Sequence, residues 1–237
     1  MKLQFECKEY KIYCPDTLIP LVNEMKNIFL IKIEEYKKLF NIDQLNQIII
    51  NYFDDINNFR DFIYSIRGKK ESLPMYAKGT FDMGMINGYI DKNNQTLRSY
   101  NANHELFHIL YLKYILKNDF SKRITWYDEG MAQFLSGEKD YLLNFDNFKN
   151  YYIKVKEETI IVPKLNEIKH GINFCNNSYN GYDLSYLCIR YLNEILDNNE
   201  FNKLMSDFEK IKDYGDNIIT NMFLYYDDII FNKKKII

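Results

Sequence analysis

Residues 103–108 read Asn-His-Glu-Leu-Phe-His, an HExxH pattern with two histidines four positions apart and a glutamate directly after the first. The surrounding residues 97–116 have helical periodicity. On a helix, residues four apart lie one turn above each other on the same face, so His104 and His108 can reach one metal ion. Glu105 then points to a water on that ion. The stretch predicts a metal site on a helix; a histidine pair without a metal is the plainer alternative.

Residues 126–134 read Trp-Tyr-Asp-Glu-Gly-Met-Ala-Gln-Phe. This segment resembles the W-x-x-E-G-x-A segment of the gluzincin zinc metallopeptidases, the peptidase MA-like group. The resemblance implies one zinc ion per chain, held by His104, His108 and Glu129. It also implies hydrolysis of peptide bonds by a zinc-activated water with Glu105 as general base. The plainer alternative for Glu129 is an ordinary first-turn glutamate favoured by the helix dipole.

A short segment before the histidine helix also resembles the gluzincins. Gly84, Met85, Ile86 and Asn87 are similar to the gluzincin edge strand, which pairs with an extended peptide through backbone hydrogen bonds. The resemblance implies that these four residues bind substrate. A plain sheet edge is the alternative interpretation.

Residues 182–192 resemble the helix that in many gluzincins carries a tyrosine some way ahead of a Tyr-Leu pair. The resemblance makes Tyr182 the candidate catalytic donor to the oxyanion of the tetrahedral intermediate. Tyr179, His170 and a tyrosine that only packs remain alternatives, since the chain has 21 tyrosines. Support for the imidazoles is expected from a carboxylate or carbonyl, with Asp128 and Gln133 near in sequence. Many relatives have an acid where Gln133 stands, so this chain departs from the family pattern at that position.

Hydrophobic periodicity predicts strands in the N-terminal part and helices after it. Strands are expected at residues 9–13, 47–53 and, as two short strands or one bent edge strand, 79–90. Helices are expected at residues 18–40, 56–66, 97–116, 127–135, 144–155, 182–196, 200–211 and 216–230. Everything after residue 90 is therefore expected to be helical or loop.

This order of elements predicts an α+β fold of the zincin-like kind. A small N-terminal mixed or antiparallel sheet with helices is followed by a mainly helical C-terminal half, with an active-site cleft between them. We expect residues 1–118 to form an N-terminal α+β lobe that ends in the HExxH helix. Residues 119–237 then form a C-terminal helical lobe, the two together making one catalytic domain.

The composition excludes several partners and leaves others open. The 31 basic and 33 acidic residues are interspersed, which argues against nucleic acid. No apolar stretch is long enough for a signal peptide or a membrane span, so a cytoplasmic protein is expected. The four scattered cysteines predict free thiols. The expected partner is a peptide or protein substrate, while its sequence, endo- or exo-cleavage and the oligomeric state stay open.

Two other functions fit the same residues. The first is a catalytically silent zinc or peptide-binding module, against which the intact Glu105 argues. The second is a non-peptidase hydrolase or a self-processing regulatory protease, which metal content alone does not distinguish from a general peptidase.

Overall fold

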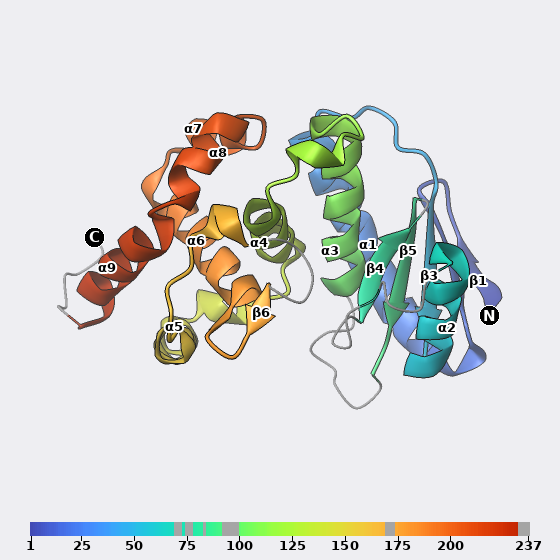
Figure 1. Ribbon diagram of the computed structural model, residues 1–237. Coiled ribbons are helices and arrows are strands. Elements are labelled where there is room, and N and C mark those ends of the chain that lie inside the picture. Colours follow the sequence, from blue (N-terminus) through green and yellow to red (C-terminus); the bar gives the residue numbers. More distant parts are fainter. Residues whose placement is uncertain (69–72, 74–77, 83, 92–99, 169–173, 232–237) are drawn as a thin grey trace. The chain divides into compact units, whose positions relative to one another are not determined.

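The computed structural model describes residues 1–68, 73, 78–82, 84–91, 100–168 and 174–231. The described residues form an α+β protein with a mixed sheet in the N-terminal half and mostly helices after it, which confirms the predicted fold class (Figure 1). They group into two compact units. Unit 1 contains residues 1–117 and 135–138, and unit 2 contains residues 118–134 and 139–237.

Unit 1 is built on a five-stranded sheet with the order β1-β2-β3-β5-β4. Its strands are β1 (Lys2–Glu6), β2 (Tyr10–Cys14), β3 (Ile48–Phe53), β4 (Gly79–Asp82) and β5 (Met85–Tyr89). The central pairs β2–β3 and β3–β5 are parallel, and the outer pairs β1–β2 and β4–β5 are antiparallel. Because β5 pairs on both sides, β4 forms one edge of the sheet.

Helices cover both faces of this sheet (Figure 1). They are α1 (Ile19–Leu39), α2 (Ile56–Arg67) and α3 (Tyr100–Leu110), the last continued by one π-helical turn at Tyr111–Ile115. Tyr10 faces α1, since its hydroxyl donates to the Lys26 carbonyl and its ring packs on Phe29. Phe53 points the other way and joins a buried cluster with Phe59 and Ile63 of α2. The strand alternation thus assigns α1 to one face and α2 to the other.

The ends of α2 show why the sequence pattern located it well. The Asp55 side chain accepts hydrogen bonds from the backbone N–H groups of Asn57 and Asn58, both at 2.9 Å. Gly68 ends the helix in the left-handed conformation, with φ of 68°. An acidic N-cap and a C-terminal glycine are the usual helix boundary signals, and both are readable in the sequence.

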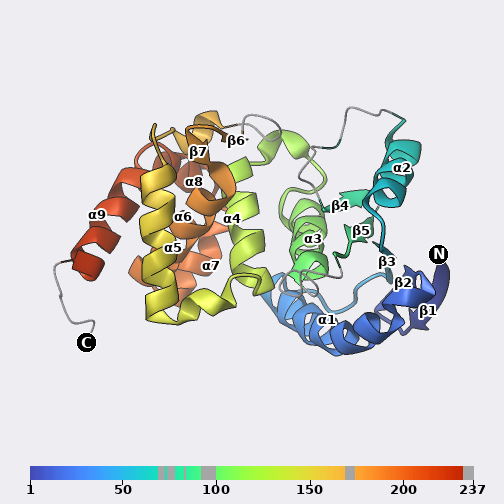
Figure 2. The same ribbon diagram turned by 90° about the horizontal axis from the view of Figure 1, so that it is seen from below.

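Unit 2 is mainly helical. Its helices are α4 (Thr125–Ser136), α5 (Phe145–Glu158), α6 (Gly181–Ile195), α7 (Asn198–Leu204), α8 (Phe208–Gly215) and α9 (Ile218–Phe231). The last two residues of α4 belong to unit 1. Helix α6 carries the core of unit 2, because Leu184, Leu187, Ile189 and Leu192 are fully buried. Helix α5 lies beside α6 (Figure 2), where the Arg190 guanidinium stacks 3.8 Å from the Phe148 ring centroid.

Three features differ from the sequence-based prediction. Strand β1 was not predicted, and a two-stranded hairpin of β6 (Cys175–Asn176) and β7 (Tyr179–Asn180) stands in the part expected to be helical or loop. The single helix predicted at residues 200–211 is two helices, because the Asp207 side chain accepts a hydrogen bond from Lys210 N and starts α8 anew.

The four cysteines form no disulfide, as predicted. Within the described ranges, no helix is both long enough and apolar enough to cross a bilayer.

Candidate metal centre

The HExxH residues lie on α3, whose orientation is fixed by packing against α1. The Phe107 ring contacts Tyr36 and Phe40, with ring centroids 6.1 and 5.7 Å apart. The Tyr36 hydroxyl also donates to the backbone carbonyl of Asn103 at 3.2 Å. These buried contacts hold α3 at one rotation about its axis. The neighbouring face of the helix, which carries the two histidines, is thereby set as well.

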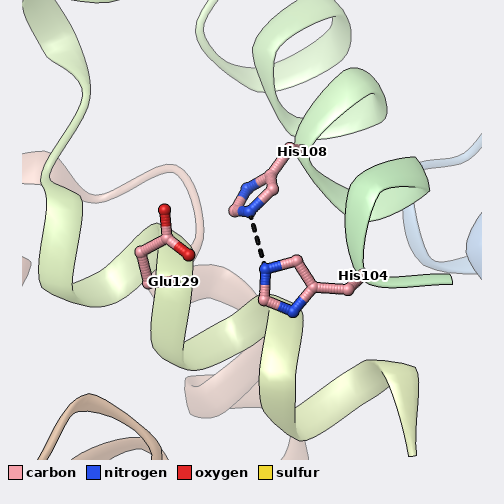
Figure 3. A group of neighbouring side chains, drawn as sticks. All are labelled: His104, His108 and Glu129. Atoms are coloured by element: carbon pink, nitrogen blue, oxygen red, sulfur yellow. Dashed lines mark hydrogen bonds between the residues drawn. The ribbon is translucent and has the colours of Figure 1, made fainter. Parts of the chain in front are cut away.

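His104 and His108 project from successive turns of α3 (Figure 3). Their Nε2 atoms lie 3.0 Å apart, and the two rings are nearly perpendicular. Phe81 of β4 packs against the His108 ring, with centroids 5.7 Å apart. The four-residue spacing therefore brings two imidazole nitrogens to one point, as the sequence pattern predicts.

Glu129 of α4 completes the group. One ligand atom from each of His104, His108 and Glu129 lies within 4.8 Å of the other two (Figure 3). His108 and Glu129 are only 5% and 3% exposed. Two imidazoles and one carboxylate are the donor set of many catalytic zinc sites, and nitrogens bound to tetrahedral zinc stand about 3.3 Å apart. The residues present therefore fit a zinc ion.

Arg123 holds the carboxylate of Glu129. Its Nη2 donates to Glu129 Oε1 at 2.9 Å, and its Nε donates to Asp128 Oδ2. Burial lowers the pKa of the Arg123 guanidinium, but the carboxylates of Asp128 and Glu129 outweigh burial and raise that pKa above its ordinary value. Arg123 is therefore a permanent positive charge beside Glu129. Asp128, which the sequence suggested as support for an imidazole, pairs with this arginine.

Glu138 lies beside the other nitrogen of His104. Its Oε2 is 3.3 Å from His104 Nδ1, and both side chains are largely buried. The segment around it is fixed to α3, since Asn103 Nδ2 donates to the Ser136 carbonyl at 3.4 Å. Gly137, with φ of 84°, turns the chain between Ser136 and Glu138. A carboxylate this close to the second nitrogen of a ligand imidazole can accept its hydrogen bond when the metal is bound, which would orient the ring and make it a stronger ligand. Sequence reasoning missed Glu138; the signal was an acid directly after a helix-ending glycine.

Residues 16–225 match the model of a peptidase family, Peptidase_M9, described as collagenase. The chain belongs to this collagenase family. Its members are zinc metallopeptidases, so the predicted enzyme class, a hydrolase of peptide bonds in peptides or proteins, is confirmed. The family implies zinc as the metal, and His104, His108 and Glu129 form the candidate site for it. No curated protein matches the chain.

The position of Glu129 in this collagenase-family chain depends on Gly130. A Cβ atom at Gly130 would lie 2.7 Å from both the Ser185 carbonyl oxygen and the Ile189 side chain. Helix α4 therefore approaches α6 so closely that a methyl group does not fit. Since the nearest atoms include backbone, the contact cannot be relieved by a rotamer change alone.

Gly130→Ala is expected to lower the free energy of unfolding by about 1–3 kcal/mol, because it overpacks the contact between α4 and α6. It is also expected to weaken zinc binding, since Glu129 shifts with the helix. Thermal unfolding and zinc titration measure the two effects. The matched control is Gly68→Ala: no atom of the described residues lies within 4 Å of its Cβ position, and its φ of 68° costs stability at the C-terminal end of α2. Wild-type zinc affinity in a destabilised Gly130→Ala would contradict the expectation.

Tyr182 lies in the first turn of α6. The Asn180 side chain accepts a hydrogen bond from Tyr182 N at 3.0 Å, and the Tyr182 ring packs edge-on against Phe174 with centroids 4.7 Å apart. Gln133 Nε2 donates to the Tyr182 carbonyl at 2.9 Å. Gln133 thus supports the backbone at Tyr182, a role that an acid at this position could not take.

Tyr179 lies in β7, and His170 lies outside the described residues. The oxyanion role of Tyr182 stays a prediction.

The expected edge strand is in a different place. Met85, Ile86 and Asn87 belong to β5, which pairs with β3 on one side and β4 on the other. Gly84 precedes this strand with φ of 76°. A strand paired on both sides has no free backbone groups for a substrate, so the prediction that residues 84–87 form the edge was wrong. Among the described strands, β4 is the edge on this side of the sheet.

Proposed function

We propose that the chain cleaves peptide bonds by attack of water on the carbonyl carbon, with Glu105 as general base. The observation that carries this proposal is the convergence of His104, His108 and Glu129 in a chain of a zinc metallopeptidase family. Zinc bound there would polarise the carbonyl and lower the pKa of a water to about 7. The chain's own residues then hold the substrate and move the protons.

Glu105 is placed to move those protons. It directly follows the first histidine on α3 and is 7% exposed, so its carboxylate works in a site with little bulk water. In the proposed step Glu105 takes one proton from the attacking water as the oxygen–carbon bond forms. It then gives this proton to the amide nitrogen as the carbon–nitrogen bond breaks. The products are a carboxylic acid and an amine.

Tyr182 is the proposed donor to the oxyanion that forms when water attacks. A phenol hydroxyl can donate one hydrogen bond to this oxygen and withdraw charge from it. The backbone of Tyr182 is held by Asn180 and Gln133, which supports a fixed position for the side chain. Tyr179 is the alternative donor.

The substrate is proposed to lie along β4 rather than along residues 84–87. Tyr89 N donates to the Lys78 carbonyl at 2.7 Å, and bonded pairs alternate along an antiparallel ladder. The backbone groups of Gly79 and Phe81 therefore face away from β5. An extended peptide can pair with these groups as an added strand. The Phe81 ring on His108 links this edge to the metal site.

Collagen-derived peptides are the first substrates to test, because the family is described as collagenase. The purified chain is expected to carry one zinc by elemental analysis and to cleave such peptides or a broader peptide library. Removal of zinc with a chelator should abolish cleavage, because the Lewis acid is lost, and one equivalent of zinc should restore it. Cleavage is followed by mass spectrometry of the products.

A parallel sample treated with a serine-protease inhibitor serves as control for contaminating peptidases. Cleavage by the metal-free chain would overturn the proposal. Zinc binding without cleavage of any library peptide would instead indicate a silent binding module, and cleavage confined to the chain itself would indicate a self-processing protease.

A further inference from the structure

The edge strand β4 has four residues, and within the described part of the chain it pairs with β5 alone. Short edge strands fray readily, because only one ladder of backbone hydrogen bonds holds them. A frayed β4 cannot present the outward backbone groups of Gly79 and Phe81 in one line. Some other contact has to keep this strand straight if it is to pair with a substrate.

Arg67 makes that contact. It is the last residue of α2, and its guanidinium binds Asp82 with two hydrogen bonds, Nε to Oδ1 at 2.6 Å and Nη2 to Oδ2 at 3.0 Å. The same Nη2 donates to Thr80 Oγ1 at 2.5 Å. Thr80 Oγ1 also lies 3.1 Å from Asp82 Oδ2. One side chain therefore binds two alternate residues of a four-residue strand.

This contact lies on the face of β4 that a peptide would not use. Alternation along the strand places Thr80 and Asp82 toward α2, while Phe81 faces the opposite way and packs against His108. Among the strands that the structure describes, none pairs with this backbone edge of β4. The side chains of Arg67 and Asp82 are 25% and 13% exposed, so water screens their pair less than a surface pair.

Arg67 is itself rigidly supported. The α2 helix ends directly after it, where Gly68 N donates to the Tyr64 carbonyl at 2.9 Å. The helix is anchored to the sheet through Phe59 and Ile63, which are fully buried in the cluster with Phe53. A planar guanidinium with two fixed donors then holds β4 at a defined distance from a fixed helix.

We propose that Arg67 is a positioning residue for substrate, which keeps β4 straight so that it can pair with an extended peptide. This inference rests on the proposed function. Without Arg67, β4 is ordered for only a fraction of the time, and the apparent affinity for substrate falls by that fraction. The chemical step, carried by groups on α3, proceeds unchanged once substrate is bound.

The test is the steady-state kinetics of Arg67→Ala, Arg67→Lys and Thr80→Val on a peptide that the wild type cleaves. Arg67→Ala is expected to raise KM about tenfold with kcat and zinc content unchanged, because charge-assisted hydrogen bonds to β4 are lost. Arg67→Lys keeps the positive charge but lacks the two fixed donors of the planar guanidinium. Its KM should lie between those of the wild type and Arg67→Ala. Thr80→Val removes one acceptor from a strand that tolerates valine and should raise KM about threefold.

Arg60→Ala on the same helix is the matched control and should leave KM unchanged. An unchanged KM in Arg67→Ala, or a loss of kcat or zinc without a change in KM, overturns the proposal. If Arg67→Ala does not fold, the KM values of Thr80→Val and Arg67→Lys are used instead. An unchanged KM in both variants then overturns the proposal. A wild type that binds zinc but cleaves nothing is a separate result, because it overturns the proposed function before Arg67 is tested.

Discussion

Glu105→Gln is expected to lower kcat by about 10²- to 10⁴-fold while zinc stays bound. Glutamine has nearly the shape of glutamate, so the packing around this buried position is kept. Its amide cannot take a proton from the attacking water or deliver one to the leaving amine. The measurements are kcat on a cleaved peptide, zinc content by elemental analysis and the melting temperature, all on wild type and variant.

The control for Glu105→Gln is Glu34→Gln, which changes an exposed glutamate of α1 that pairs with Lys37. This variant should cleave like the wild type. A Glu105→Gln enzyme with wild-type kcat would show that another group is the base. Loss of zinc in Glu105→Gln would show that Glu105 supports the metal site rather than the proton transfer.

Local signals predicted the parts of the fold that depend on neighbouring residues. Helix α2 begins after Asp55 and ends before Gly68, and both residues act through contacts within four positions. The histidine pair is equally local, because one helical turn brings His104 and His108 together. Such features need no knowledge of the rest of the chain.

The sheet order could not be read in the same way. Strands β4 (79–82) and β5 (85–89) are both short and contain glycine, and only the pairing of β5 with β3 decides which of them is the edge. This pairing joins Ile50 to Ile86 across 36 positions. Strand order is a consequence of such distant contacts, which hydrophobic alternation within one strand does not encode.

The support around the metal ligands also depends on distant contacts. Glu138 meets His104 because the chain turns at Gly137 after α4, which brings together residues 34 positions apart. Arg123 lies before α4 and reaches forward to Glu129. The sequence predicted that a carboxylate or a carbonyl would support the imidazoles, with Asp128 and Gln133 as the candidates near in sequence. It did not point to Glu138, because only the turn at Gly137 brings this residue to His104.

His104→Ala and Glu129→Ala are each expected to weaken zinc binding by about 10³-fold and to abolish cleavage. Apparent zinc binding free energies of about 10–16 kcal/mol, divided among three or four ligands, assign roughly 3–5 kcal/mol to each ligand. Zinc affinity is measured by competition with a chromogenic chelator. Glu129→Ala leaves Arg123 paired with Asp128, so no buried charge is left alone and the unit is expected to fold.

Glu138→Gln is expected to have a zinc affinity between that of the wild type and those of the ligand variants. Its side chain lies beside His104 Nδ1 without belonging to the cluster of ligand atoms, so its loss is expected to weaken zinc binding by only about 10–100-fold. The order of affinities should therefore be wild type, then Glu138→Gln, then the two ligand variants. Wild-type zinc affinity in folded His104→Ala would place the metal elsewhere. Equal losses in all three variants would mean that Glu138 is a ligand itself, because a residue acting only through His104 cannot cost as much as His104.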